Sequence, residues 1–251
     1  VGIADDFGGI PKLEECYDPK SKAHIIAGTY PVGKDCVDEI NALLDVFERY
    51  GVEVFRPKNI NGLNQVFSRD IAFVIADKLV LPNIIKNRKE EVSAIDDVIS
   101  QISPECILKM PEEARVEGGD VMPLNGCVFV GYSEKEDFKK YVASRTNRAG
   151  LDFLVAAFPT KKIKGFELNK SDIDPRENAL HLDCCFQPIG KNSAIMYKGG
   201  FKNEADIDFL VNYFGAENII NVSKEEMYNM NANVFSISEQ VIVSEKGFTR
   251  L

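Results

Sequence analysis

The sequence contains no apolar run near twenty residues, which excludes a membrane-spanning helix of the usual length. Glycine and proline are sparse, with 18 and 11 in 251 residues, so a collagenous chain and a disordered chain are also excluded. Hydrophobic residues make up 45% of the chain and charged residues 27%. This composition predicts a soluble globular protein, and its length suits one domain over residues 1–251.

Positively charged residues are fewer than negatively charged ones. Lys and Arg number 30 against 39 Asp and Glu, which gives a net charge of −9, and no dense basic cluster stands out. Binding to nucleic acid phosphates or to an anionic membrane is therefore disfavoured. A small cationic ligand suits this charge balance better.

Residues that hold zinc or form disulfides are also few. The chain has only His24 and His181, no H-E-x-x-H motif and, among six cysteines, no C-x-x-C pair. No metal site of the usual kinds is expected. The start of the chain has neither a basic region nor an apolar segment typical of a secretion signal, so we expect a reducing, cytoplasmic compartment.

An internal repeat organises what is present. Four segments predict a helix, a glycine or proline that ends it, and then a strand: 35–50 with 52–55, 91–102 with 106–110, 137–158 with 162–168, and 204–214 with 219–222. Four apolar pairs of runs predict hairpins at 71–82, 121–132, 184–197 and 233–245. The repeat of hairpin, helix and strand predicts an α/β solenoid or a closed propeller, and closure is favoured because it protects strand edges.

Short polar groups introduce the hairpins at the same point of each repeat. Asp70, Asp120, Asp183 and Asn233 mark these points at intervals of 50, 63 and 50 residues. Equivalent positions of a closed repeat converge on its axis, so we expect one anionic pocket that binds a cation. Its candidate residues are Asp70, Glu117, Asp120, His181 and Asp183.

Each of these residues also has a structural interpretation. Asp70 follows Arg69, and its structural interpretation is an ion pair with a neighbouring residue that closes a turn. The structural interpretation of the Glu117–Asp120 segment is an ordinary loop that leads into a strand. A lone histidine is commonly a core residue, but Asp183 follows His181 by two positions, which in a strand places both on one face. A carboxylate beside an imidazole favours its protonated form and prepares it for proton transfer.

Two adjacent cysteines, Cys184 and Cys185, are candidate nucleophiles because a thiolate near a base or a cation is reactive. Free cysteine is nevertheless among the most buried residue types. We therefore expect both to pack in the core.

In combination, the motifs Asn64-x-x-Phe67-x-Arg69-Asp70, Glu117-Gly118-Gly119-Asp120 and His181-Leu182-Asp183 resemble those of the guanidine-modifying superfamily. Its members include arginine deiminases, dimethylarginine dimethylaminohydrolases and amidinotransferases. The resemblance covers nearly the whole chain. It implies a five-bladed α/β propeller, the pentein fold, in a compact form without an extra helical domain and with an incomplete final blade.

The resemblance also implies roles for the site residues. Asp70 and Asp183 hold the substrate guanidinium, Glu117 and His181 form the acid–base pair, and Asn64 and Phe67 flank the substrate. Two carboxylates suit a guanidinium because its planar fork of five donors forms bidentate hydrogen bonds. Asp120 is expected in the same substrate pocket. Arg145 is expected either to meet a substrate α-carboxylate or to be a solvated arginine at a helix end.

The reaction that the resemblance implies is hydrolysis of a guanidino group through a covalent amidino-cysteine, with no cofactor or metal. Transfer of the amidino group to an amine and a non-catalytic binding propeller stay open as alternatives. The family's nucleophilic cysteine is expected C-terminal to Leu251. The stretch 4–22 is expected to be an active-site lid or a surface loop, and the identity of the guanidino substrate and a homo-oligomeric state stay open.

Overall fold

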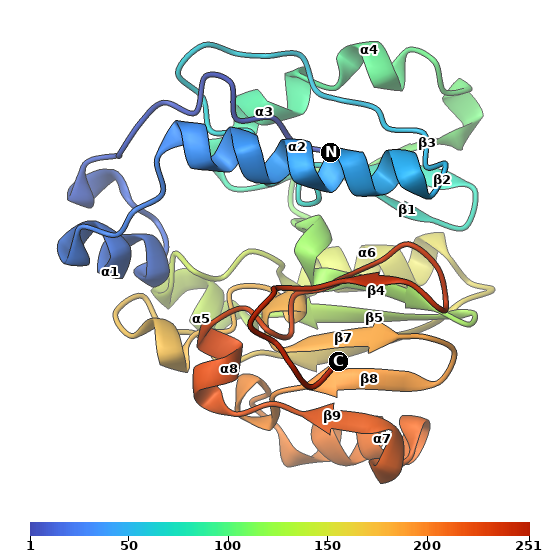
Figure 1. Cartoon of the computed structure of the whole chain (residues 1–251). Helices are drawn as coiled ribbons and strands as arrows, with labels where there is room; N and C mark the ends of the chain where they lie inside the picture. Colours follow the sequence, from blue (N-terminus) through green and yellow to red (C-terminus); the bar gives the residue numbers. More distant parts are fainter. The chain divides into compact units, whose positions relative to one another are not determined.

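The computed structural model describes residues 1–251, which form two compact units. The first unit comprises Val1–Cys16 and Lys20–Gly118, and the second comprises Tyr17–Pro19 and Gly119–Leu251. Figure 1 labels the helices and strands of both units. No helix is both long and apolar enough to cross a membrane.

The sheets repeat one design. Each three-stranded sheet is an antiparallel hairpin whose second strand also pairs in parallel with a third strand further along the chain. The first unit holds one such sheet, and the second unit holds two, with a fourth hairpin of two strands. The strands are β1 (Phe73–Ile75), β2 (Lys78–Leu81), β3 (Ile107–Lys109), β4 (Val121–Leu124), β5 (Cys127–Tyr132), β6 (Lys162–Glu167), β7 (Phe186–Ile189), β8 (Ser193–Met196), β9 (Ile219–Asn221), β10 (Phe235–Ser236) and β11 (Ile242–Val243).

The helices are α1 (Pro19–Ala27), α2 (Gly33–Arg49), α3 (Lys89–Ser93), α4 (Asp96–Ile99), α5 (Lys135–Lys140), α6 (Arg148–Ala157), α7 (Glu204–Phe214) and α8 (Lys224–Tyr228). Helices α3 to α7 connect the first three hairpins to the third strand of their sheets, as the repeat predicts, whereas α1 and α2 precede β1 and α8 lies between β9 and β10. Gly51 and Gly215 follow α2 and α7 with positive φ angles of 66° and 83°, a conformation open to glycine. The predicted glycine stops are confirmed.

Turn chemistry sets the hairpin register. In the β4–β5 hairpin, Asn125 and Gly126 have φ angles of 48° and 82°, and Leu124 pairs with Cys127 across them. Two successive residues with positive φ match the twist of the flanking strands, which is why Asn-Gly is the strongest hairpin signal. The four predicted hairpins are confirmed.

Two predicted helices are interrupted. The expected helix over 91–102 is divided between α3 and α4, because the carbonyl of Ala94 accepts from the amide of Lys58 at 2.6 Å instead of continuing a helix. The expected helix over 137–158 is divided between α5 and α6. There Asn147 caps a new helix by accepting from the amide of Gly150 at 2.8 Å.

The predicted strand over 52–55 is wrong. These residues form no strand, and Val52 and Phe55 are 37% and 46% exposed. The carbonyl of Phe55 accepts instead from the backbone nitrogen of Val1 at 2.9 Å, outside any sheet.

An aromatic cluster forms the core of the second unit. Phe129 on β5 and Phe186 on β7 meet edge to face with ring centroids 5.7 Å apart, and Phe166 on β6 lies 5.8 Å from Phe129. Phe214 and Leu210 from α7 pack against the same cluster. Such aromatic packing holds the strands rigidly, and with them the turns that lead into β4 and β7.

Candidate functional site

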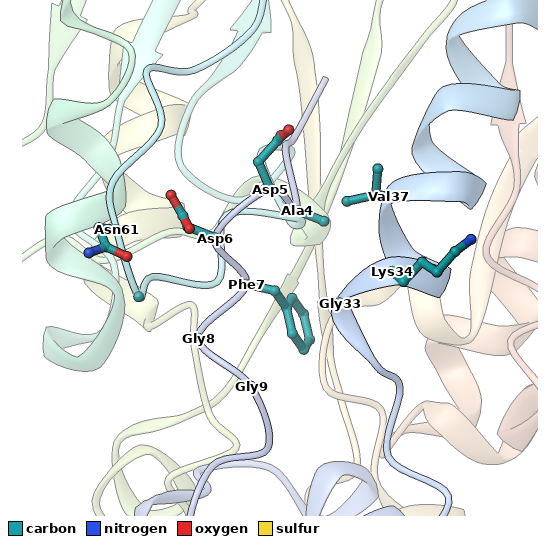
Figure 2. A pocket seen from close by; sticks show the side chains of 11 residues that line it. Ala4, Asp5, Asp6, Phe7, Gly8, Gly9, Gly33, Lys34, Val37 and Asn61 are labelled. Atoms are coloured by element: carbon teal, nitrogen blue, oxygen red, sulfur yellow. The ribbon is translucent and has the colours of Figure 1, made fainter.

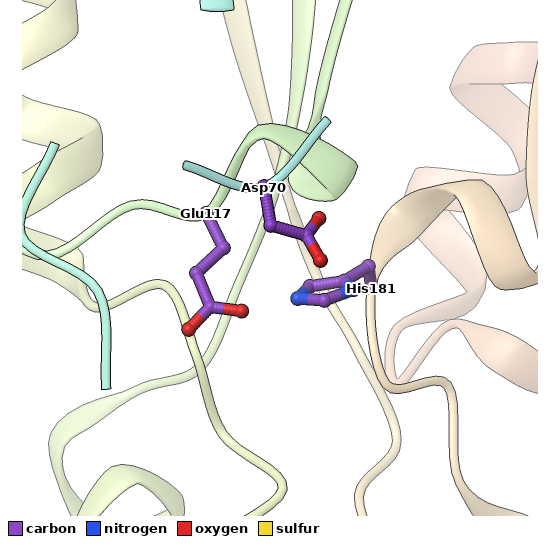
Figure 3. Close-up of side chains that lie close together, drawn as sticks. All are labelled: Asp70, Glu117 and His181. Atoms are coloured by element: carbon purple, nitrogen blue, oxygen red, sulfur yellow. The ribbon is translucent and has the colours of Figure 1, made fainter. Parts of the chain in front are cut away.

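Figure 3 shows the carboxylate side chains of Asp70 and Glu117, which belong to the first unit. They are buried, only 6% and 0% exposed. Asp70 lies just before the β1–β2 hairpin, and its Oδ2 accepts from Nη1 of Arg88 at 2.6 Å. The same Nη1 lies 3.6 Å from Oε2 of Glu117. A single guanidinium therefore contacts both carboxylates that the sequence motifs single out in this unit.

Arg88 is itself held from the other side. Its Nε and Nη2 donate to the two carboxylate oxygens of Glu91, both at 2.8 Å, and Nη2 also donates to the carbonyl of Phe67 at 3.0 Å. Burial acts to lower the pKa of Arg88, but the hydrogen bond to Glu91 and the surrounding carboxylates raise it above its usual range. Arg88 is thus a fixed cation among three carboxylates.

Backbone contacts fix the two carboxylates as well. The amide of Ile85 donates to Oε1 of Glu117 at 3.2 Å, and the amide of Gly118 donates to the carbonyl of Asp70 at 3.1 Å. A Cβ atom on Gly118 would lie 2.0 Å from the carbonyl oxygen of Arg69. Glycine after Glu117 is required for this close approach.

The sequence missed Arg88, although Glu91 three positions later is a signal for an ion pair on one helical turn. The other predicted residues of this unit lie in the segment before Asp70. Asn64 accepts from the amide of Val66 at 3.1 Å, and the ring of Phe67 is 58% exposed with the Arg88 guanidinium 5.9 Å from its centroid.

In the second unit, His181 and Asp183 are each 5% exposed. They belong to a 3₁₀ turn, Leu182–Cys184, that precedes β7, with His181 at its N-cap. The expectation that they share a strand face is therefore wrong, because a 3₁₀ turn does not alternate its side chains. Figure 3 also labels His181, whose ring comes from the turn that leads into β7.

Asp120 lies just before β4 and is fully buried. Its Oδ2 accepts from the hydroxyl of Thr146 at 2.7 Å, and its Oδ1 accepts from the amide of Leu182 at 2.8 Å. Burial raises the pKa of Asp120, and the charges of His181 and Lys170 oppose that rise. Asp120 therefore joins segments 26 and 62 residues away from it.

Lys170 is a second residue that the sequence missed. Its ammonium donates to the carbonyls of Ala179 and Leu180, both at 2.7 Å. Burial lowers the pKa of Lys170, and the charge of Asp120 opposes that fall. No local pattern marks this lysine, because its partners are defined by the folded chain.

Arg145 is 1% exposed, so the alternative of a solvated arginine at a helix end is wrong. Its Nε donates to the carbonyl of Val142 at 3.3 Å and its Nη2 to the carbonyl of Tyr17 at 3.4 Å. The guanidinium also lies 5.2 Å from the centroid of the Tyr17 ring. These contacts hold Arg145 in one place.

The adjacent cysteines are core residues, as expected. Cys185 is completely buried in the aromatic cluster, and Cys184 is 9% exposed. Burial raises the pKa of both thiols. A raised pKa disfavours the thiolate form that nucleophilic attack requires.

The first unit also contains a pocket of about 570 Å³ (Figure 2), and neither Asp70 nor Glu117 lines it. Residues 4–9 and the start of α2 line it, with Asp5, Asp6 and Lys34 as its charged side chains. The stretch 4–22, expected to be a lid or a surface loop, is only partly irregular. It contains a 3₁₀ turn at Leu13–Glu15 and the first residues of α1.

Comparisons with known proteins give a family and a fold. A family model described as N,N dimethylarginine dimethylhydrolase, eukaryotic, matches residues 29–249. The protein YkgA of Bacillus subtilis is 30% identical over 218 residues, which cover 85% of this chain and 68% of YkgA.

Solved structures match over most of the chain at low sequence identity. DDAH from Pseudomonas aeruginosa, complexed with citrulline, has a TM-score of 0.68 at 17% identity, and the match covers 88% of this chain and 77% of that one. The N-terminal domain of ArgZ, an arginine dihydrolase from the ornithine–ammonia cycle in cyanobacteria, was solved bound to substrate. It has a TM-score of 0.71 at 17% identity, covering 93% and 78%. These matches show that the chain has the α/β fold of those proteins.

Proposed function

We propose, given that this chain belongs to the N,N dimethylarginine dimethylhydrolase family of the guanidine-modifying pentein superfamily, that it hydrolyses the guanidino group of arginine or a related compound. One observation carries this proposal. The four ionisable residues that the family motifs supply, Asp70, Glu117, His181 and Asp183, are all 6% exposed or less. Charged groups are seldom buried to this extent without a partner or a function.

Asp70 and Asp183 are proposed to bind the substrate guanidinium. A carboxylate in a water-poor site forms short, charge-assisted hydrogen bonds with a planar guanidinium, which a plain ammonium cannot match in geometry. The contact of 2.6 Å between Asp70 and Arg88 supports this assignment, because it shows Asp70 accepting from a guanidinium while buried.

Glu117 and His181 are proposed as the acid–base pair. His181 donates the proton to the leaving amine, and Glu117 supplies the negative charge that favours the protonated imidazole. The remaining substrate contacts are assigned to Asn64 and Phe67 along the guanidino group and to Arg145 at a substrate α-carboxylate.

The covalent step of the proposal is attack of a cysteine thiolate on the guanidinium carbon. The carbon–nitrogen bond to the leaving amine then breaks as the amine takes a proton from His181. Water next adds to the amidino carbon and gives a proton back to His181, and the carbon–sulfur bond breaks, which releases the ureido product and restores the thiolate. The raised pKa values of Cys184 and Cys185 argue against these two thiols as the nucleophile.

The proposed architecture is the single-domain, five-bladed α/β propeller of the superfamily. Three sheets of identical design support it, since each combines an antiparallel hairpin with a parallel third strand. The β10–β11 hairpin supports a further repeat of the same kind.

A mass-spectrometric product survey tests the function. The full-length protein is incubated with arginine, methylated arginines, agmatine and guanidinoacetate, each with and without glycine as an acceptor amine. A ureido product with release of ammonia or methylamine, without glycine, is the expected result. Product that appears only with glycine would instead identify an amidinotransferase, and no product from any substrate would favour a binding protein.

A further inference from the structure

We propose that Asp120 is a positioning residue that fixes His181 and Arg145 and does not bind the substrate. The roles of His181 and Arg145 rest on the proposed function, but the contacts of Asp120 do not. Its carboxylate is fully buried, and each of its two oxygens accepts a hydrogen bond from within the second unit.

The first of these hydrogen bonds caps the turn that carries His181. His181 stands at the N-cap of the 3₁₀ turn Leu182–Cys184, and its own side chain makes no capping hydrogen bond. The amide of Leu182 is therefore a donor that the turn itself leaves without a partner. Oδ1 of Asp120, which lies 62 residues earlier in the sequence, accepts from this amide at 2.8 Å, as a capping side chain would.

The backbone on the other side of His181 is held by Lys170. Its ammonium donates at 2.7 Å to the carbonyls of Ala179 and Leu180, which directly precede His181. Opposite charges on Asp120 and Lys170 thus fix the peptide groups on both sides of the histidine. The backbone that carries the ring of His181 is thereby held on both sides.

The second hydrogen bond of Asp120 fixes the segment of Arg145. The hydroxyl of Thr146 donates to Oδ2 of Asp120 at 2.7 Å, and the carbonyl of Thr146 accepts from the amide of Ser133 at 2.9 Å. Arg145, the adjacent residue, is thereby tied both to Asp120 and to the end of β5. One buried carboxylate connects the two segments that the proposed function brings to one substrate.

Close packing leaves little space for another role. Gly131 on β5 lies against this carboxylate, and a Cβ atom at that position would be 2.5 Å from Oδ1 of Asp120 and 2.9 Å from Cβ of Leu182. A substrate guanidinium would have to reach a carboxylate that Gly131, Thr146 and Leu182 enclose. Such close surroundings disfavour substrate binding at Asp120.

Histidine-selective NMR tests the proposal without requiring any activity. The chain contains only His24 and His181, so ring-labelled protein gives two sets of ring signals, which the variant His24→Gln assigns. In Asp120→Asn we expect the His181 signals to shift or broaden while those of His24 stay in place. Asp206→Asn is the matched control, because Asp206 is also buried in the second unit, 7% exposed, and pairs with Lys164 at 2.6 Å. It should leave both histidines unchanged.

Kinetics separate positioning from substrate binding. For Asp120→Asn we expect kcat to fall by about 100-fold, because displacing a reacting group by about 1 Å has an effect of this size. A rise in KM with unchanged kcat and unmoved His181 signals would overturn the proposal. If the wild-type protein turns over no guanidino compound, the proposed function fails while the NMR comparison still decides the role of Asp120.

Two further measurements cover the case in which Asp120→Asn does not fold. Thr146→Val removes only the hydroxyl that donates to Oδ2, and we expect it to shift the His181 signals and to lower kcat, whereas unchanged His181 signals with unchanged kcat would count against the proposal. In the wild-type protein, the amide of Leu182 should be strongly protected from hydrogen exchange. Exchange of Leu182 as fast as an exposed amide would overturn the proposal.

Discussion

Asp70 in the first unit and Asp120 in the second hold the same place in the repeat, directly before a hairpin, yet their partners differ in kind. Asp70 accepts from the guanidinium of Arg88 at 2.6 Å, whereas Asp120 accepts from a hydroxyl and a backbone amide. Both are buried, at 6% and 0% exposure. The repeat thus determines where a carboxylate lies, and its neighbours determine what it does.

The difference is electrostatic. Arg88 places a full positive charge among Asp70, Glu91 and Glu117, so the carboxylates of the first unit share one cation. Asp120 forms its hydrogen bonds with neutral donors, and burial raises its pKa. The first arrangement suits recognition of a guanidinium, and the second suits a fixed structural connection.

The largest effect that this comparison predicts is the loss of turnover when one of the two proposed substrate-binding aspartates is neutralised. Asp70→Asn should lower kcat/KM by about 100-fold or more, because it removes the negative charge that is proposed to pair with the substrate guanidinium in a buried site. Asp183→Asn should do the same, and both should leave the circular dichroism spectrum intact. Asp77→Asn, in the exposed turn of the same β1–β2 hairpin, is the control. Unchanged substrate affinity in Asp70→Asn or Asp183→Asn would contradict the two-carboxylate site.

The next effect is on the stability of the first unit. Arg88→Met should lower the free energy of unfolding by about 3–5 kcal/mol, since it leaves three buried carboxylates without their cation. Arg148→Met removes an exposed arginine that pairs with Asp152 at 3.0 Å, and it should cost less than about 1 kcal/mol. Urea unfolding of both variants measures the difference. Equal losses would mean that the Arg88 cluster contributes no more than a surface ion pair.

A smaller effect separates two glycines. Gly118→Ala should destabilise by about 3 kcal/mol, because its Cβ would overlap the carbonyl of Arg69 at 2.0 Å and the backbone must shift. Gly126→Ala meets nothing within 4 Å and is opposed only by its φ of 82°. That strain should cost about 1 kcal/mol. Thermal unfolding of the two variants gives the order, and a larger loss for Gly126→Ala would be inconsistent with the close approach beside Glu117.

The smallest effect is expected at the adjacent cysteines. Because burial raises the pKa of Cys184 and Cys185, a thiol reagent at pH 8 should modify the four half-buried cysteines first and these two only after unfolding. Cys184→Ser should leave turnover unchanged. Peptide mapping after labelling measures the order in which the cysteines react. Rapid labelling of Cys184 together with loss of turnover would indicate that Cys184 is the nucleophile.

The sequence predicted those elements whose signals are local. Asn125 and Gly126 specify a tight hairpin by their own conformational preferences, and Gly51 and Gly215 end helices in the same way. The divided helices were not predictable from periodicity. The contact of Ala94 with Lys58 is long-range, and the cap at Asn147 is decided by the surrounding fold.

The residues of the candidate site also differ in whether local sequence patterns predict them. The motifs located Asp70, Glu117, His181 and Asp183, all of which are buried. Arg88 escaped notice, although Glu91 marks a local ion pair. Lys170 and Thr146 gave no signal at all, because their partners lie 9 to 26 residues away and meet them only in the folded chain.

The central claim is that water, and not an amine, accepts the amidino carbon. The most direct test is turnover of arginine and methylated arginines by the full-length protein in oxygen-18-labelled water, followed by mass spectrometry of the product. The account predicts a ureido product whose new oxygen carries the label, formed without any added amine. Absence of labelled ureido product, or product formed only when an acceptor amine is present, would contradict it.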